Sequence, residues 1–308
     1  MLRILLALLI AVSPAFAAGP RAKVASKADP FKLGVSERND VQFSDTGFGD
    51  TTAKTVRSRT INTGIRNLVL LIFGQSNCTS VAQTAYSPTN GTVLDQLNIL
   101  DGQMYAAADP LLGQSLAIAP GSTGTFGPGS IGIRVGDQLI TNNKFDRVIL
   151  VPFCIGGAGV ATWGSGGFLF PNSAAAMARL AQVGITPGMT GVTFAALWMQ
   201  GESDHGMAQA TYAANFATIS AALIATGFNG RIFVNEETWL SGTTDANVQA
   251  AQTTSIPNNT TPGTWAGANA DSLGAGSRQS DNTHFTPAGL ASLTTLIVAA
   301  MAASGAPF

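Results

Sequence analysis

Residues 67–77 read NLVLLIFGQSN, an uninterrupted apolar run that ends in a glycine and three polar residues. Three later segments have the same character: RVILVPF at 147–153, VTFAALWM at 192–199 and RIFVN at 231–235. Continuous apolar runs of this length are typical of strands buried on both faces of a parallel sheet. The segment 95–118 contains QLNIL and is a candidate fifth strand before a long loop, although its type is ambiguous.

Helical patterns lie between and after these runs, near 130–142, 173–183, 208–226 and 287–303. Thr286 and Pro287 introduce the last of them, and Thr at the N-cap with Pro at the first helical position is a strong start signal. Strands that alternate with helices predict a three-layer α/β domain around a central, mostly parallel sheet of about five strands. In such sheets, ligands bind beyond the carboxyl ends of the strands.

The N-terminal part of the chain has a different composition. Residues 1–17 combine Arg3, an apolar run from Ile4 to Val12 and a small-residue end at Ala17, the pattern of a cleaved signal peptide. Residues 18–66 form a polar extension, because positions 20–66 hold nine of the sixteen Lys and Arg. Residues 67–308 are the expected catalytic domain, and export places the protein outside the cell or in the periplasm.

Composition excludes several partner classes. The formal net charge is −1 and only 11% of residues are charged, which gives no reason to expect nucleic acid binding. The apolar run near the N-terminus is too short to span a bilayer, so no membrane association is expected of the mature protein. The oligomeric state is not decided by the sequence.

Four polar or glycine-rich clusters follow the strands or precede the last helix: FGQSN, CIGGAGVATW, MQGESDH and DNTHF. One pocket at the carboxyl edge of the sheet would collect all four. Ser76 lies two residues after Gly74 at a strand-to-helix turn, where backbone N–H groups are free to bind an oxyanion. A plain helix cap is the alternative role for Ser76.

A nucleophilic serine needs a base, and the chain has only two histidines, His205 and His284. Asp281 precedes His284 by three residues, so its carboxylate can reach the imidazole and fix its tautomer. His284 with Asp281 is therefore the preferred base. A pair of Glu202 and His205 is the rival assignment.

Oxyanion donors are expected from the second and third clusters. The glycines at 156, 157 and 159 permit close approach of the backbone, and Gly157 is the preferred donor. The side-chain amide of Gln200 can supply a further hydrogen. No metal-ligand spacing and no phosphate-binding loop is present in the sequence, so neither a metal nor a cofactor is expected.

The blocks GQSN, GGAGVATW, WMQGESD and DNTH, in this order, resemble those of the SGNH/GDSL hydrolases, and most closely the branch of sialate O-acetylesterases and acetylxylan esterases. The resemblance covers residues 67–300. It implies a flavodoxin-like α/β/α fold and an oxyanion hole made by Ser76, Gly157 and Gln200. It also implies supporting roles for Gln75, Asn77 and Glu202 in the site.

The resemblance leaves Cys78 and Cys154 unexplained. They flank the Ser76 and Gly157 segments, and a disulfide between them is allowed in an exported protein but not decided by the sequence.

The resulting hypothesis is a secreted serine esterase that removes O-acetyl groups from a carbohydrate through Ser76, His284 and Asp281. Two alternatives remain open. One is an SGNH lipase, thioesterase or arylesterase that acts on other acyl esters. The other is a carbohydrate-binding module that keeps the fold without catalysis.

Overall fold

The computed structural model describes residues 51–114 and 127–308 of the 308-residue chain. The expected signal peptide, 1–17, and most of the extension, 18–66, lie outside the described residues.

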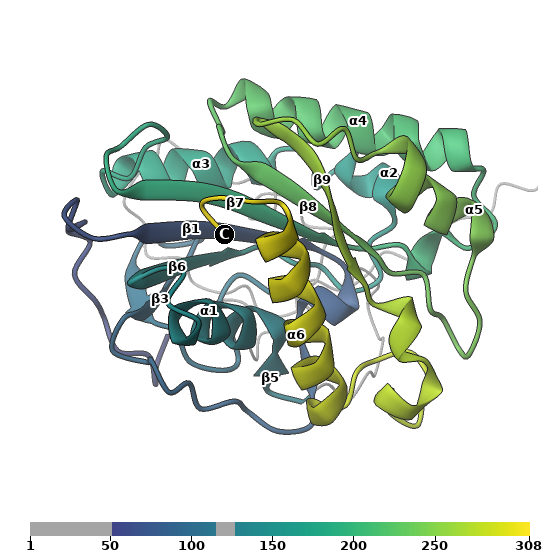
Figure 1. The fold of residues 1–308 in the computed structure, drawn as a ribbon, viewed down its shortest axis with the longest axis horizontal. Coiled ribbons are helices and arrows are strands. Elements are labelled where there is room, and N and C mark those ends of the chain that lie inside the picture. The colour runs from purple at the N-terminus through teal and green to yellow at the C-terminus, as the bar shows by residue number, and fades with distance from the viewer. Residues whose placement is uncertain (1–50, 115–126) are drawn as a thin grey trace, which may run out of the picture.

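A seven-stranded sheet forms the centre of the domain, in the order β4-β3-β6-β1-β7-β8-β9 (Figure 1). All neighbouring strands are parallel except β3 and β4, which are antiparallel. The strands are β1 (Asn67–Gly74), β3 (Leu94–Leu97), β4 (Met104–Ala106), β6 (Arg147–Pro152), β7 (Val192–Met199), β8 (Arg231–Glu236) and β9 (Gly263–Asn269). A separate antiparallel pair joins β2 (Ser80–Ala82) to β5 (Gly129–Ser130).

The predicted mostly parallel α/β architecture is confirmed, with seven strands instead of about five. The four long apolar runs are strands, and QLNIL overlaps the fifth, β3. The sequence reading missed β4, which has three residues, and β9, whose sequence GTWAGAN is only partly buried at the sheet edge. An edge strand needs no continuous apolar run, because part of its surface stays in solvent.

Five of the parallel strands have the flavodoxin-like arrangement. Numbered along the chain, β1, β6, β7, β8 and β9 are spatially ordered 2-1-3-4-5, and β3 and β4 extend the sheet beyond β6. The chain direction across the sheet therefore changes at β1. This order makes the junction of β1 and β7 the topological switch point, the usual ligand-binding position in this fold.

Helices cover both faces of the sheet, with α1 (Ile131–Thr141) and α6 (Pro287–Ala303) on one face and α3 (Asn172–Gln182) and α4 (Gln209–Ala225) on the other (Figure 1). All four agree with the predicted helices to within about two residues. The Thr286 side chain caps α6 by accepting from the Gly289 N–H at 3.0 Å.

Shorter helical segments occur mostly at the loops after the strands. These are η1 (Ser76–Cys78), α2 (Val160–Trp163), η2 (Glu202–Asp204), α5 (Ala246–Ala250), the π-helical turn η3 (Ala251–Ser255), η4 (Asp271–Leu273) and η5 (Ala275–Ser277).

The side chains of β1 alternate between the two halves of the core. Val69, Leu71 and Phe73 pack with α3 and α4, and the intervening Leu68, Leu70 and Ile72 pack with α1 and α6. All six are at most 1% exposed. Strand side chains point alternately to opposite faces, so a strand between two helical layers must be apolar at every position.

The described end of the N-terminal extension packs against the edge of the sheet. Val56 forms an antiparallel bridge with Tyr105 on β4, and the Lys54 ammonium donates to the Ala108 and Pro110 carbonyls, both at 2.6 Å. Arg147 donates to the Ser58 and Thr60 carbonyls. Residues 54–60 therefore lie along the β4 and β6 side of the domain.

Among residues 51–114 and 127–308, no helix is both long enough and apolar enough to cross a lipid bilayer.

Gly74 is the point at which β1 gives way to the polar loop. Its φ is +140°, and a Cβ at this position would lie 1.9 Å from the Met199 carbonyl oxygen on β7. The Gln75 N–H donates to that same oxygen at 2.8 Å. Only glycine combines this backbone conformation with so close an approach of two strands.

We predict that Gly74→Ala destabilises the fold strongly, because the new methyl group collides with backbone atoms that cannot move independently. Gly227→Ala is the matched control, since Gly227 also has positive φ, +92°, but has open space around it. The control should cost about 1–3 kcal/mol from backbone strain, and Gly74→Ala at least ~2 kcal/mol more. Urea unfolding measures both variants. Equal losses would contradict a steric role for Gly74.

Candidate active site

Ser76 stands at the start of η1, immediately beyond the β1 end. It is 6% exposed, and its carbonyl accepts from the Thr79 N–H at 2.9 Å and the Thr79 hydroxyl at 2.6 Å. The residue before it, Gln75, makes no side-chain capping bond. Within the described residues, the Ser76 N–H donates to no protein acceptor. The turn thus holds the serine firmly and leaves one N–H available at the site.

Asn77 connects three parts of the site. Its Nδ2 donates to Glu202 Oε1 at 2.7 Å and lies 3.4 Å from the Thr283 carbonyl, and its Oδ1 accepts from the Phe285 N–H at 3.2 Å. Thr283 and Phe285 flank His284. The side chain of Asn77 is fully buried, so it fixes the position of the His284 segment relative to the Ser76 turn.

Asp281 and His284 form the pair expected from their spacing. His284 Nδ1 lies 2.6 Å from Asp281 Oδ2, and Asp281 Oδ1 accepts from the Thr283 and His284 N–H groups at 2.9 and 3.0 Å. Partial burial raises the pKa of Asp281, but these hydrogen bonds outweigh it and hold that pKa below its usual value. The carboxylate therefore stays ionised at neutral pH and orients the imidazole through Nδ1.

Gln75 and Gln200 meet where β1 and β7 end. Gln75 Oε1 accepts from Gln200 Nε2 at 2.9 Å and from the Ser203 N–H at 3.1 Å. Gln200 Nε2 also donates to Asp204 Oδ2, and Gln200 Oε1 accepts from the Tyr212 hydroxyl at 2.8 Å. Both hydrogens of the Gln200 amide are engaged within the protein. Donation to a substrate oxygen would require one of these bonds to be exchanged.

Asp204 links the β7 loop to the glycine-rich loop after β6. Its Oδ2 accepts from the Val160 N–H at 2.8 Å, at the first residue of α2. A Cβ on Gly159 would lie 3.0 Å from Asp204 Oδ1, so glycine makes room for this carboxylate. No sequence pattern indicated this bond, because nothing in local spacing pairs residues 44 positions apart.

Gly157 lies on the exposed side of the same loop. Its φ is +72°, and no atom lies within 4 Å of where a Cβ would stand. Its N–H donates to no acceptor among the described residues. Gly157 therefore presents a backbone donor to solvent beside the loop that Asp204 anchors.

His205 and Glu202 do not form the rival pair in the described structure. Glu202 Oε1 accepts from Asn77, and Glu202 Oε2 has no hydrogen-bond partner. His205 Nε2 instead contacts the Thr238 carbonyl, and the neighbouring Gly206 N–H donates to Asp245 at 2.7 Å. His205 thus belongs to a contact between the β7 and β8 loops.

A buried charged cluster lies behind the His284 segment, made of Glu202, Glu237, Asp271 and Arg278, each at most 6% exposed. The sequence reading singled out only Glu202 here. Glu237 lies in the loop that follows β8, directly after the strand ends at Glu236, and this position was the available signal. Arg278 lies three residues before Asp281 in a segment without periodicity, so no sequence pattern indicated it.

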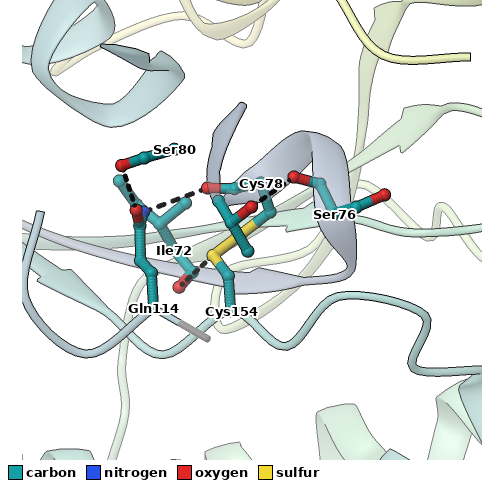
Figure 2. The surroundings of a disulfide bond; sticks show 7 residues. Ile72, Ser76, Cys78, Ser80, Gln114 and Cys154 are labelled. Carbon is teal, nitrogen blue, oxygen red and sulfur yellow. Dashed lines mark hydrogen bonds between the residues drawn. A yellow bond between two sulfur atoms is a disulfide. The ribbon is translucent and has the colours of Figure 1, made fainter. Parts of the chain in front are cut away.

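A disulfide joins Cys78 to Cys154, with their Cα atoms 5.7 Å apart. Cys78 is the last residue of η1, and Cys154 follows β6 just before the glycine-rich loop. Figure 2 shows the bond beside the turn that carries Ser76, with Gln114 Nε2 donating to the Cys78 carbonyl at 3.1 Å. The bond connects the segments that carry Ser76 and Gly157.

Residues 51–114 and 127–308 contain no group of three or more His, Cys, Asp or Glu side chains placed to hold a metal ion.

The fold and these contacts define an α/β domain with a polar site at its topological switch point. The solved structures that resemble it include the following two. A protein from Arabidopsis thaliana has 17% identity and a TM-score of 0.56, and the match covers 77% of this chain and 98% of that one. NanS has 17% identity and a TM-score of 0.51, covering 77% and 97%. No curated protein matches the chain significantly in sequence.

Residues 66–303 match the family described as carbohydrate esterase, sialic acid-specific acetylesterase, and the chain belongs to this family. The family assignment makes the protein an acetylesterase that removes O-acetyl groups from carbohydrates.

We predict that removing the disulfide impairs both stability and catalysis. The bond closes a segment of 76 residues, and constraining the unfolded chain in this way contributes typically about 2–4 kcal/mol. Cys78→Ser with Cys154→Ser should lower the unfolding free energy by about that amount and reduce kcat. Mild reduction of the unmodified enzyme should mimic the double variant and have no effect on it. Activity insensitive to both treatments would contradict a role for the bond in the site.

Proposed function

We propose that the protein is a secreted serine esterase whose catalytic triad is Ser76, His284 and Asp281. The Asp281–His284 hydrogen bond of 2.6 Å carries this assignment, because it gives one of the two histidines an ionised carboxylate on Nδ1, and Nε2 is the proposed acceptor of the serine proton. Asn77 supports it, since the residue next to Ser76 bonds to both residues that flank His284.

The proposed reaction is acyl transfer in two steps. Ser76 Oγ attacks the acetyl carbonyl carbon while its proton passes to His284. The imidazolium then gives that proton to the sugar oxygen as the bond between this oxygen and the acetyl carbon breaks, so the sugar leaves with a free hydroxyl and the acetyl group stays on Ser76. Water then attacks the acetyl-serine with His284 again as base, releasing acetate and regenerating the serine. Asp281 stays ionised throughout and stabilises the imidazolium.

The oxyanion formed in each step needs hydrogen-bond donors. The Ser76 and Gly157 N–H groups are the proposed pair, supported by their lack of protein acceptors in the described chain. Gln200 joins them only if its amide gives up Gln75 or Asp204. In the structure as described, Gln75 and Gln200 align the loops that follow β1 and β7, and Glu202 holds Asn77 in place.

We propose that the substrate is an O-acetylated sialate or an acetylated polysaccharide, and that the protein acts after export. The family description supports the substrate class, and the pattern of residues 1–17 supports export. NanS shares the fold of this chain.

Replacing Ser76 by Ala tests the nucleophile. We predict that kcat for an aryl acetate falls at least ~10³-fold, because the residual activity of triad variants comes from substrate binding and the oxyanion hole alone. Circular dichroism and the thermal midpoint should stay unchanged, since the residue loses one oxygen atom. Full activity in Ser76→Ala would overturn the proposed function, and ligand binding without turnover in the unmodified protein would favour a binding module.

The two histidines provide a matched pair of variants. We predict that His284→Ala loses at least ~10³-fold in kcat/KM, whereas His205→Ala loses less than ~10-fold, because His205 contacts the Thr238 carbonyl rather than the serine turn. The reverse order would assign the base to His205. Rates with acetyl, butyryl and octanoyl esters of one alcohol separate an acetylesterase from a lipase, since only the latter prefers the longer chains.

A further inference from the structure

Arg278 holds the His284 segment from inside the protein. Its Nη1 donates to the Thr283 carbonyl at 2.8 Å, and its Nη2 lies 3.2 Å from the Ala270 carbonyl. The guanidinium carbon lies 3.5 Å from the centre of the Phe285 ring, and the backbones of residues 278 and 285 form an antiparallel bridge. The residues before and after His284 are thus both in contact with one arginine side chain.

This arginine is 5% exposed and therefore needs negative charge nearby, because an isolated buried cation is costly. Glu237 and Glu202, 0% and 1% exposed, are the carboxyl groups whose charges act most strongly on Arg278. Neither Glu237 oxygen, nor Glu202 Oε2, nor Arg278 Nε has a hydrogen-bond partner in the described residues. These three side chains therefore interact mainly through their charges.

The third acid of the cluster has a different partner set. Asp271 accepts from the Thr238 and Trp239 N–H groups, the Thr238 hydroxyl and the Gln249 amide, at 2.7–3.0 Å. Its charge is matched by these donors. Glu202 and Glu237 remain as the acids that balance Arg278.

The charged cluster also reaches the serine. Glu202 Oε1 accepts from Asn77 Nδ2, one residue beyond Ser76. Asn77 therefore connects the Ser76 turn to Glu202, the charge of Glu202 acts on Arg278, and Arg278 contacts both neighbours of His284.

We propose that Arg278 is a positioning residue for His284, and that the buried carboxyl pair Glu202 and Glu237 is its counter-charge. The inference rests on the proposed triad. Arg278 acts on His284 through the backbone of residues 283–285, where Nη1 donates to the Thr283 carbonyl, and through its positive charge. The pair keeps the guanidinium in place and connects it, through Asn77, to the nucleophile.

The charge state of the pair follows from its surroundings. Burial raises the pKa of Glu202 to about 7, and burial together with Glu202 raises that of Glu237 well above its usual value. Because the pKa of Glu202 is raised, this carboxyl keeps its proton in the folded protein between about pH 4.5 and 7, where the same group in the unfolded chain has lost it. The buried surroundings thus favour the protonated form of both carboxyl groups relative to the unfolded chain.

The first test is a set of variants assayed for kcat and KM on an aryl acetate. Arg278→Lys keeps the charge but cannot span two carbonyls and stack on Phe285, so we expect kcat to fall ~10-fold or more with KM nearly unchanged. Glu237→Gln leaves Glu202 as counter-charge, so its kcat should fall less than the kcat of the double Gln variant, which combines Glu202→Gln with Glu237→Gln. Arg179→Met is the control, because Arg179 is also buried and holds the Ile99 and Leu100 carbonyls, yet it should lower only the thermal midpoint.

The second test is the pH dependence of kcat/KM, which a purely structural role would not move. Asp281 bonds to His284 on its own segment, Arg278 contacts the residues on either side of it, and the charges of Glu237, Glu202 and Asp271 act on Arg278. Arg278→Met removes a positive charge, so the acid limb should move up by about 0.5 pH unit or more. The double Gln variant leaves Arg278 uncompensated, so the limb should move down. Arg179→Met should leave it in place.

The outcomes distinguish this inference from the proposed function. Suppose that Ser76→Ala and His284→Ala are inactive, while Arg278→Lys and the double Gln variant keep the kcat and the pH profile of the unmodified enzyme. This result would overturn the role of Arg278 and leave the proposed triad intact. Active Ser76→Ala and His284→Ala would overturn both. Loss of kcat with opposite shifts of the acid limb supports the positioning role, and if Arg278→Met does not fold, Arg278→Lys and the double Gln variant still decide it.

Discussion

The close approach of β1 and β7 at Gly74 and Met199 determines where every part of the site lies. The two strands run side by side along their whole length, and the Gln75 N–H bonds to the Met199 carbonyl just as β1 ends. A side chain at position 74 would separate them. Because the strands stay together to their last residues, Gln75 and Gln200 leave the sheet as neighbours, and the loops that follow are close enough for single side chains to connect.

Neutral amide side chains make most of those connections. Gln75 bonds to Gln200 and the Ser203 N–H, and Asn77 bonds to Glu202 and to the backbone around His284. An amide offers a donor and an acceptor at once and has no charge to desolvate, so it can be fully buried at lower cost than a carboxylate or an ammonium. This explains why the serine lies between Gln75 and Asn77. The two flanking residues are structural links, and Ser76 is the member of the three whose side chain has no such task.

Much of the fold was accessible to sequence reasoning because burial on both faces leaves a continuous apolar run, as in β1, β6, β7 and β8. The short edge strands β4 and β9 leave no such trace. The Asp281–His284 contact was predictable because it is local, three residues along the chain. The contacts of Asp204 with Val160 and of Asn77 with Phe285, and the electrostatic interaction of Arg278 with Glu237, were not, since they join distant segments and depend on three-dimensional packing.

Those distant contacts give the site its most costly feature, a cluster of ionisable groups in a nearly dry interior. A buried ion pair is weak evidence for stability, because desolvation offsets the attraction and apolar side chains of similar size would pack at least as well. Burying Arg278, Glu202 and Glu237 therefore needs an explanation other than stability. The segment 278–285 has no regular secondary structure beyond one bridge, and it carries His284, which as the proposed base must be held within a fraction of an ångström of the serine. Apolar packing alone fills space but does not fix carbonyl positions, whereas a planar guanidinium that donates to Thr283 and stacks on Phe285 fixes both sides of His284. On the proposed mechanism, the buried charges lower the stability of the fold and fix the position of His284.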